Sequence, residues 1–212
     1  MESGIALLGN TDFILGVNMT LTELYQEKVK CNACRLRTGC TQVVPGDGCM
    51  ESPILMLVGE CGGQEEDEIG VPFVGRCGQL LREVLRATKI INRTNTLISN
   101  TVGCRPPKNK FPTDDCPNIC VSKWLWKEIE LAAPKRMLLL GNTPLKYVAG
   151  LTGITTNRGR WFNIRGIRTL ATYHPSYILR TDQAGMLQHR ETFEADIKDV
   201  ANEVKTLLEG SK

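Results

Sequence analysis

The sequence predicts an α/β fold, a three-layer αβα sandwich around a central, mainly parallel, four-stranded sheet. Short apolar runs alternate along the chain with longer stretches in which apolar residues recur at helical spacing. Strands that alternate with helices favour right-handed crossovers, which place parallel strands in one sheet and helices on both of its faces. The length of 212 residues suits a single domain over residues 1–212, with about residues 1–20 as an additional N-terminal segment.

The expected elements follow one another along the chain. A helix is predicted over 20–30, with Thr20 or Thr22 as its cap. Four short apolar runs predict buried strands, at 54–58, 96–99, 137–140 and 169–172. Stretches with one apolar face predict helices between and after these strands, at 78–88, 116–131, 143–148 and 191–208.

The charge balance and the N-terminus narrow the class of protein. The chain has 26 basic and 23 acidic residues, and the net charge of +3 permits nucleic acid as a partner without requiring it. The N-terminus carries an acidic residue where a secretory signal carries positive charge, and no run approaches the roughly 18 apolar residues of a membrane span. We therefore expect a soluble, intracellular protein of the cytoplasm or nucleoid, without a membrane partner.

An acidic glycine turn, GECGGQEEDEIGVPFVGR at 59–76, follows the first predicted strand. Ligands of parallel α/β sheets bind at the carboxyl ends of the strands, so this turn is expected to line a pocket. It has neither the lysine of a P-loop nor the glycine spacing of a dinucleotide site, and its five carboxylates would repel an anion. The turn therefore predicts a neutral or electron-poor ligand.

Nine cysteines are many for an intracellular chain, in which clustered cysteines more often bind metal than form disulfides. A C-x-x-C pair with two distant cysteines can hold zinc or an iron–sulfur cluster, and spacing alone does not choose between them. In the alternative interpretation the distant cysteines are buried apolar side chains. Five cysteines have a suggestive layout, namely Cys31, Cys34, Cys104, Cys116 and Cys120.

Five stretches together resemble one known family. In chain order they are CNAC, PFVGR, ISNTVGCRPPKN, GNTPLKYVAG and RGRWFNIRGIRTLATYHPSYILR. Their order and spacing are similar to those of the family 4 uracil-DNA glycosylases, the iron–sulfur branch of the uracil-DNA glycosylase superfamily, over residues 31–180. The resemblance implies the αβα sandwich and a structural 4Fe-4S cluster, whereas zinc, which the cysteine spacing also permits, stays the alternative metal. The implied ligands are Cys31, Cys34, Cys104 and Cys120.

The resemblance also implies how a base is held. A glycosylase flips its target nucleotide into a pocket, stacks on the base and reads its edge. Phe73 matches the stacking aromatic, and Asn100 matches the amide that pairs with a carbonyl and an N–H of uracil. Glu66 matches the position that crowds the 5-carbon of uracil and rejects the methyl group of thymine. Without the resemblance, Phe73 would be assigned to the core and Asn100 to a turn.

Two residues are expected to act on the glycosidic bond. His174 matches the donor to O2 of the departing uracil, where negative charge develops. Glu60 matches an acidic residue that orients water or stabilises the cationic sugar. The chain departs from the family at Cys61, usually Ala or Gly, and at Gly62, usually Pro. Both positions should face the substrate, and activity could be reduced, redirected to another base or lost.

DNA contacts are expected from basic and apolar residues near His174. Arginines cluster before the last strand, and Arg180 follows the His174 loop, so phosphates are the expected partners. Tyr177 and Ile178 could enter the minor groove as an apolar wedge. The alternative for the arginines is ordinary solvated surface, and for Ile178 it is packing in the core. The remaining histidine, His189, is expected to be solvated. The other residues assigned to DNA are Arg158, Arg160, Arg165, Arg168 and Ser176.

These features predict a monofunctional uracil-DNA glycosylase that hydrolyses the N-glycosidic bond and leaves an abasic site, since no lyase lysine is evident. It would act as a monomer in base excision repair, on DNA containing uracil or another modified base. A replication or repair protein stays open as a further partner. Two alternatives remain: a member of the superfamily that acts on another modified base, and a non-catalytic DNA-binding or replication-accessory module.

Overall fold

A six-stranded mixed sheet forms the centre of the computed structural model, which describes residues 19–210. The strand order is β1-β3-β2-β4-β6-β5, and β3, β2, β4 and β6 run parallel to one another. The two edge strands pair antiparallel with their neighbours. In chain order the strands are β1 (Asp47–Gly48), β2 (Leu55–Cys61), β3 (Thr96–Val102), β4 (Arg136–Leu140), β5 (Trp161–Ile164) and β6 (Ile167–Thr172).

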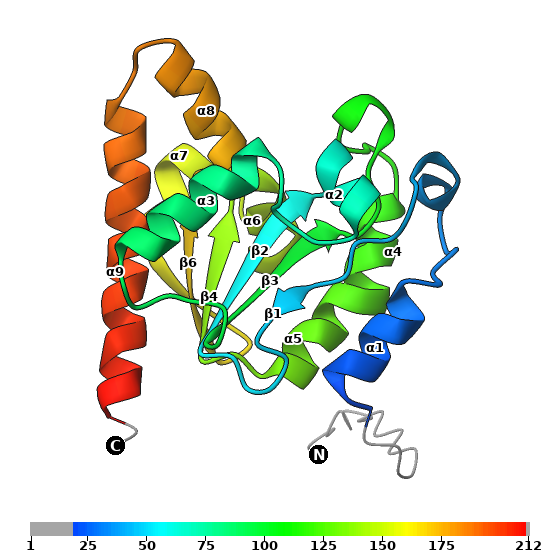
Figure 1. Cartoon of the computed structure of the whole chain (residues 1–212), viewed down its shortest axis with the longest axis horizontal. Coiled ribbons are helices and arrows are strands. Elements are labelled where there is room, and N and C mark those ends of the chain that lie inside the picture. Colours follow the sequence, from blue (N-terminus) through cyan, green and yellow to red (C-terminus); the bar gives the residue numbers. More distant parts are fainter. Residues whose placement is uncertain (1–18, 211–212) are drawn as a thin grey trace, which may run out of the picture.

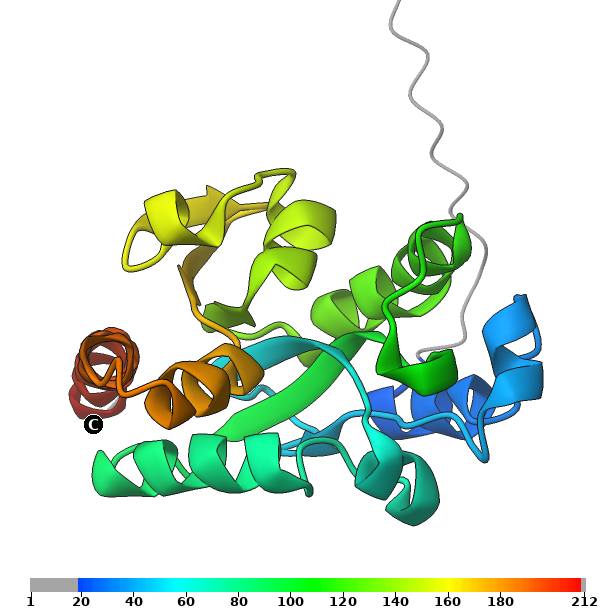
Figure 2. The same cartoon turned by 90° about the horizontal axis from the view of Figure 1, so that it is seen from above.

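Helices cover both faces of the sheet, as the α/β prediction requires. Figure 2 shows α3 on one face and the segment from α4 to α7 on the other. The helices are α1 (Leu21–Lys28), α2 (Gln64–Ile69), α3 (Arg76–Ala87), α4 (Cys116–Cys120), α5 (Trp126–Ala132), α6 (Asn142–Ala149), α7 (Ile154–Asn157), α8 (Pro175–Gln183) and α9 (Gln188–Glu209). A π-helical turn, Val121–Leu125, joins α4 to α5.

The sequence prediction of four strands is wrong in number, because it omits both edge strands. Strand β1 has only two residues, and β5 lies within an arginine-rich segment whose residues are half-buried or exposed. Neither has the buried apolar run from which the other strands were recognised. The expected helix over 20–30 begins at Leu21, and Thr20 forms a capping box with Glu23. Most of the additional N-terminal segment lies outside the described residues.

Three parallel strands end at the same edge of the sheet. Glu60 lies at the end of β2, Asn100 lies near the end of β3, and His174 follows β6. In Figure 1 this edge is the upper one, where α2 and α8 also begin. A Cβ atom at Gly59 would collide with the side chains of Asn100 and Phe73, so glycine lets these two groups approach the strand.

None of the helices among residues 19–210 has the length and the apolar character that crossing a membrane requires.

Candidate active site

A pocket of ≈ 480 Å³ opens at the carboxyl edge of the sheet. It lies where parallel α/β sheets commonly bind ligands. All the residues that the sequence assigned to catalysis or to the base line it, namely Glu60, Cys61, Gly62, Glu66, Phe73, Asn100 and His174. Ser176 and Arg180, which were assigned to DNA, lie at the same pocket. Segments more than 100 residues apart in sequence therefore meet at one cavity.

Asn100 brings an unpaired acceptor to this pocket. Its side chain is buried, and Oδ1 has no hydrogen-bond partner within the described part of the chain. A buried polar atom without a partner costs about 1–3 kcal/mol, so such atoms call for a ligand or water. Oδ1 of Asn100 can accept a hydrogen bond from an N–H group placed in the pocket.

Phe73 forms part of the pocket wall. Its ring centroid lies 6.1 Å from that of the His174 imidazole. Its backbone has φ +55°, a left-handed conformation that costs a residue other than glycine of order 1–3 kcal/mol. Arg82 holds this turn by donating from Nε to the carbonyl of Phe73 at 3.1 Å and from Nη2 to that of Pro72 at 3.2 Å. The ring is thus buried and at the same time held against the pocket.

His174 caps α8 through its own imidazole. The backbone N–H of Ser176 donates to Nδ1 at 3.2 Å, and Ser176 Oγ lies 2.8 Å from the same nitrogen. Burial, together with the charge of Arg180, lowers the pKa of His174 to about 4, so the ring is neutral at pH 7. Because Nδ1 accepts from the backbone, the single ring proton is on Nε2. His174 therefore offers a neutral N–H donor.

Glu60 lines both this pocket and a second cavity of ≈ 360 Å³. The hydroxyl of Thr143, near the start of α6, donates to Glu60 Oε2 and orients the carboxylate. The two cavities share Glu60, His174, Ser176 and Arg180. Sequence reasoning did not assign a role to Thr143, although it belongs to the quoted stretch GNTPLKYVAG.

The acidic turn is held together by its own carboxylates. Glu66 accepts from the backbone N–H of Gly63 at 2.9 Å and from that of Gly75 at 2.8 Å, so both of its oxygens brace the turn. Asp67 accepts from the backbone N–H of Thr41 at 2.9 Å. Both carboxylates are buried. Two of the acidic residues of this turn therefore stabilise its backbone and that of the neighbouring segment.

Cys61 contributes a protonated thiol to the pocket. Burial, reinforced by the carboxylates of Glu60 and Glu66, raises the pKa of Cys61. A thiolate is the nucleophilic form of cysteine, so this side chain is not poised for attack at neutral pH. Among the pocket residues without a role assigned from the sequence are Cys77, near the start of α3, and Asn109, in the loop after β3. Asn109 is the last residue of the quoted stretch ISNTVGCRPPKN.

The four predicted cysteine ligands line one cavity between α1, β3 and α4. They are Cys31, Cys34, Cys104 and Cys120. Apolar residues and Trp124 complete the walls, and Trp124 Nε1 donates to Cys31 Sγ at 3.1 Å. Within residues 19–210, however, no group of three or more histidine, cysteine or acidic side chains is arranged to hold a metal ion. A cavity lined by four thiols, with apolar walls and an N–H donor to one sulfur, has the chemical groups that an iron–sulfur cluster requires.

The structure corrects part of the predicted DNA surface. Ile178 is fully buried, so its assignment to a groove wedge is wrong and it packs in the core. Tyr177 is half-buried, with its ring 4.8 Å from that of Tyr173 and 5.2 Å from that of His189. His189 is therefore packed against aromatic rings, which contradicts the expectation of a solvated residue. Arg180 stays exposed at the rim of the pocket.

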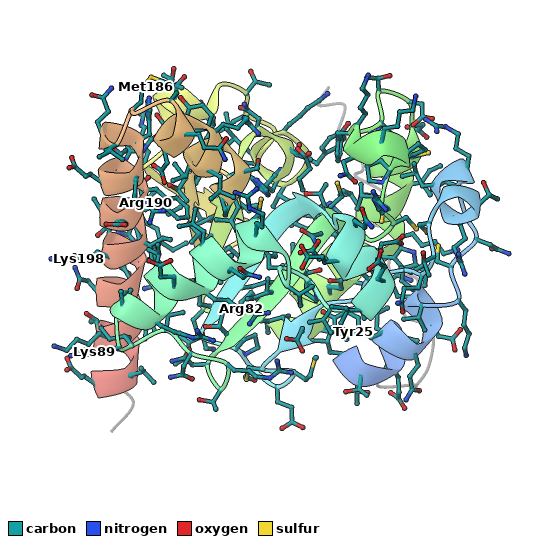
Figure 3. The ribbon with its side chains drawn as sticks, turned by 45° about the horizontal axis from the view of Figure 1, so that its top comes forward. Tyr25, Arg82, Lys89, Met186, Arg190 and Lys198 are labelled. Atoms are coloured by element: carbon teal, nitrogen blue, oxygen red, sulfur yellow. The ribbon has the colours of Figure 1, made fainter. Side chains whose placement is uncertain are left out.

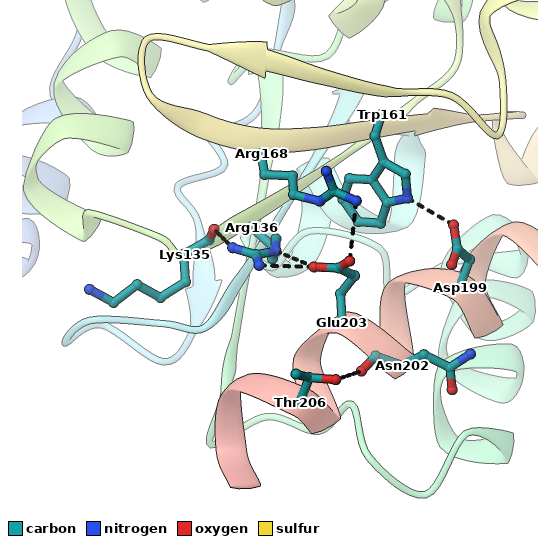
Figure 4. Close-up of polar contacts among 8 residues, drawn as sticks. All are labelled: Lys135, Arg136, Trp161, Arg168, Asp199, Asn202, Glu203 and Thr206. Carbon is teal, nitrogen blue, oxygen red and sulfur yellow. Dashed lines mark hydrogen bonds and ion pairs between the residues drawn. The ribbon is translucent and has the colours of Figure 1, made fainter. Parts of the chain in front are cut away.

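The predicted arginine cluster divides between the two ends of the sheet. Arg168 pairs with the first residue of β4, at the end opposite the pocket, and forms an ion pair with Glu203. Figure 4 shows Arg168 and Arg136 converging on this carboxylate. Arg165, in the β5–β6 turn, stacks 3.8 Å from the ring of Trp126. Arg165 and Arg168 therefore contact other parts of the fold, away from the pocket.

The other two arginines lie nearer the pocket edge. Arg158 pairs with the buried carboxylate of Asp196. Arg160 is exposed and precedes β5, next to Gly159, whose N–H donates to the carbonyl of Ala171 near the end of β6. Of the predicted cluster, Arg160 therefore has the placement that suits a contact with DNA.

Comparisons with known proteins agree with this geometry. Residues 45–198 match the family model of the uracil DNA glycosylase superfamily. A type-4 uracil-DNA glycosylase of Thermotoga maritima is 40% identical over 76% of this chain and 84% of the relative. Those of Sulfurisphaera tokodaii and Archaeoglobus fulgidus are 33% and 31% identical, each over 85% of this chain and over 83% and 92% of the relative. The chain therefore belongs to the uracil DNA glycosylase superfamily, in its type-4 branch.

Proposed function

We propose that the protein is a monofunctional uracil-DNA glycosylase, which hydrolyses the N-glycosidic bond of flipped-out uracil in DNA and leaves an abasic site for base excision repair. The observation that carries this proposal is the unpaired Oδ1 of Asn100 in a pocket with an aromatic wall and a neutral imidazole donor. Uracil presents an N–H beside two carbonyl groups. It therefore supplies the donor that Asn100 lacks and acceptors for pocket donors.

Base recognition follows from three side chains. Phe73 stacks on the face of uracil, while Asn100 Oδ1 accepts the N3–H and the amide N–H donates to O4. Glu66 shapes the wall beside the 5-carbon. Because both of its oxygens are held by backbone N–H groups, this wall resists displacement by the methyl group of thymine. The turn at Cys61 and Gly62 supplies the main chain around the base.

Bond cleavage places negative charge on uracil and positive charge on the sugar. His174 donates from Nε2 to O2 of the departing base, and it does so as a neutral ring because its pKa is low. The Glu60 carboxylate, oriented by Thr143, stabilises the cationic sugar and positions the attacking water. On the DNA side, Arg180, Ser176 and Arg160 bind phosphates, and Tyr177 lines the second cavity behind Glu60.

A direct assay tests this function. The protein is incubated with an oligonucleotide that contains one uracil and with a matched thymine control, and alkali-labile sites and the released base are measured. We expect uracil-specific release that leaves an abasic site. Binding of intact DNA without base release would favour the accessory module. Release of a different modified base would show another specificity, which the departures from the family at Cys61 and Gly62 would then explain.

We further propose that Cys31, Cys34, Cys104 and Cys120 hold a 4Fe-4S cluster. Bound there, the cluster supplies a rigid cross-link between the segment after α1 and the loop from β3 to α4. That loop carries Asn109 to the base pocket, so the cross-link supports the DNA-facing surface. Trp124 stabilises the negative charge on the Cys31 sulfur.

The ligand set predicts which cysteine variants lose the cluster. Anaerobically purified protein should absorb broadly in the visible range, and Cys120→Ser should lose this absorption together with much of its iron. Cys116→Ser, four residues earlier in the same helix, should keep both, and so should Cys49→Ser outside the cavity. A colourless wild-type protein that contains zinc would establish the alternative metal. Retention of iron by Cys120→Ser would contradict the ligand set.

A further inference from the structure

Two cysteines outside the predicted ligand set lie beside it. Cys116 is buried in an apolar cluster, and Cys40 packs against that cluster. Neither of them lines the cavity that the four predicted ligands share. Figure 1 and Figure 3, in which Tyr25 marks α1, show the blue segment that follows α1 on the same side of the molecule as the green α4. This region therefore holds more thiols than the four that bind a 4Fe-4S cluster.

Cys116 is held next to Cys34, the second cysteine of the C-x-x-C pair. Arg35, the residue after Cys34, donates from Nε to Asp114 Oδ2 at 2.5 Å. The other oxygen of Asp114 accepts from the backbone N–H of Cys116 at 3.2 Å. The two chain segments are thus joined directly beside the two cysteines, and the side chains of Cys34 and Cys116 share a hydrogen bond. A second thiol is therefore in contact with the Cys34 sulfur.

Cys40 is held next to Cys104 in a similar way. Val43, three residues after Cys40, forms an antiparallel β-bridge with Cys104. The side chains of Cys40 and Cys104 share a hydrogen bond. Arg37 donates from Nη1 to the carbonyl of Cys40 at 3.3 Å and to its sulfur at 3.9 Å. An N–H donor to sulfur stabilises the negative charge of a thiolate ligand, so Cys40 already has a group that suits metal binding.

The surroundings of Cys120 are different. Its sulfur accepts from the backbone N–H of Gly103, and the thiol that interacts with it is Cys31, itself a predicted ligand. Cys116 lies four residues earlier in α4, but its thiol is hydrogen-bonded to Cys34. The predicted ligands therefore differ in whether an additional thiol stands next to them.

We propose that Cys116 and Cys40 are reserve ligands for the cluster, a proposal that rests on the proposed 4Fe-4S site. Cys116 replaces Cys34 when that thiol is lost, and Cys40 replaces Cys104 in the same manner. Cysteine binds metal as the thiolate. As the bond from iron to the ligand sulfur breaks and the bond to the reserve sulfur forms, the proton of the reserve thiol passes along their hydrogen bond to the departing sulfur. This exchange leaves the charge of the site unchanged and needs no oxidant or reductant.

Alanine variants, which leave no oxygen that could bind iron, test the reserve ligands. Anaerobically purified Cys34→Ala should keep most of the visible absorption and iron of the wild type, because Cys116 binds in place of Cys34. Cys34→Ala/Cys116→Ala should lose both. The same contrast is expected between Cys104→Ala and Cys104→Ala/Cys40→Ala. Cys120→Ala is the matched control, and it should lose the absorption and the iron as a single variant.

Equal iron contents in Cys34→Ala and Cys34→Ala/Cys116→Ala, whether high or low, would overturn the reserve role of Cys116. A second comparison uses proteins that keep all four predicted ligands. In air, Cys40→Ala/Cys116→Ala should lose its visible absorption several-fold faster than the wild type, whereas Cys49→Ala should match the wild type. Equal rates for all three proteins would overturn the reserve role while the cluster stood. A wild-type protein without iron would instead show that the proposed cluster fails, and the reserve role with it.

Discussion

His174→Ala is expected to lower the single-turnover rate of uracil excision by about 10²–10³-fold, the usual cost of removing one donor to a developing oxyanion. The imidazole is the neutral donor of the pocket, with Nδ1 held by the backbone N–H of Ser176. DNA affinity should change much less than the rate, because the phosphate contacts remain. The other histidine, His189, packs against Tyr177 outside the base pocket, so His189→Ala serves as the control. Equal rates for wild type and His174→Ala would contradict the assigned role.

The low pKa of His174 also predicts how stability depends on pH. In the folded protein this pKa is about 4, whereas an unfolded histidine titrates near 6.5. Between these values the unfolded chain binds the additional proton, so stability falls as the pH drops from about 6.5 toward 4, by about 3 kcal/mol in total. Thermal unfolding at pH 7 and pH 4.5 should show a smaller loss for His174→Ala than for wild type. An equal loss of stability in the two proteins would contradict the assignment of this pH dependence to His174.

Glu128→Ala is expected to lower the free energy of unfolding by about 3–5 kcal/mol, because it leaves a buried charge without its partner. Lys28 of α1 is 1% exposed and forms an ion pair with the fully buried Glu128 of α5. Glu128 also accepts from the hydroxyl of Ser99 at 2.6 Å and from that of Tyr25 at 3.3 Å. Burial and the Glu128 charge raise the pKa of Tyr25, which keeps this hydroxyl a donor.

Two further variants separate charge from packing. Lys28→Met/Glu128→Leu removes both charges with similar volume and should recover much of the stability lost in Glu128→Ala. The exposed pair of Lys30 and Glu27 is the control, and Glu27→Gln should change stability by less than about 1 kcal/mol. Urea unfolding under anaerobic conditions measures all of these values. If Glu128→Ala were as stable as Glu27→Gln, the buried ion pair of Lys28 and Glu128 would not have the expected effect on the free energy of unfolding.

The sequence predicted the parts of the fold that periodicity encodes. Each of the four parallel strands is a short apolar run, and the helix predicted at 78–88 buries its apolar residues, namely Leu80, Leu81, Val84 and Leu85. The edge strands were missed because pairing with a neighbour, and not a buried apolar run, defines them. Lys28 and Glu128 were missed for a related reason: a charged residue on a helix is typical of the surface, and only the packing of α1 on α5 encloses both.

For the site, the resemblance to the family selected the side chains that line the pocket, and Glu60, Asn100 and His174 meet there because strand ends meet at one edge of a parallel sheet. The expected groove wedge was assigned wrongly in this way. Ile178 follows His174 closely in sequence, but the helical turn that His174 caps directs its side chain into the core. Which arginines lie near the pocket edge is likewise decided by strand register, which places Arg168 at the far end of the sheet.

Inhibition by the free base tests the central claim most directly, namely that Asn100 Oδ1 reads the N3–H of uracil. Uracil and N3-methyluracil are compared as inhibitors of excision by the wild-type protein. The pocket predicts that uracil inhibits and that N3-methyluracil, which has no N3–H and adds a methyl group facing Asn100, inhibits at least roughly 10-fold more weakly. Equal inhibition by the two bases would contradict the assignment of Asn100.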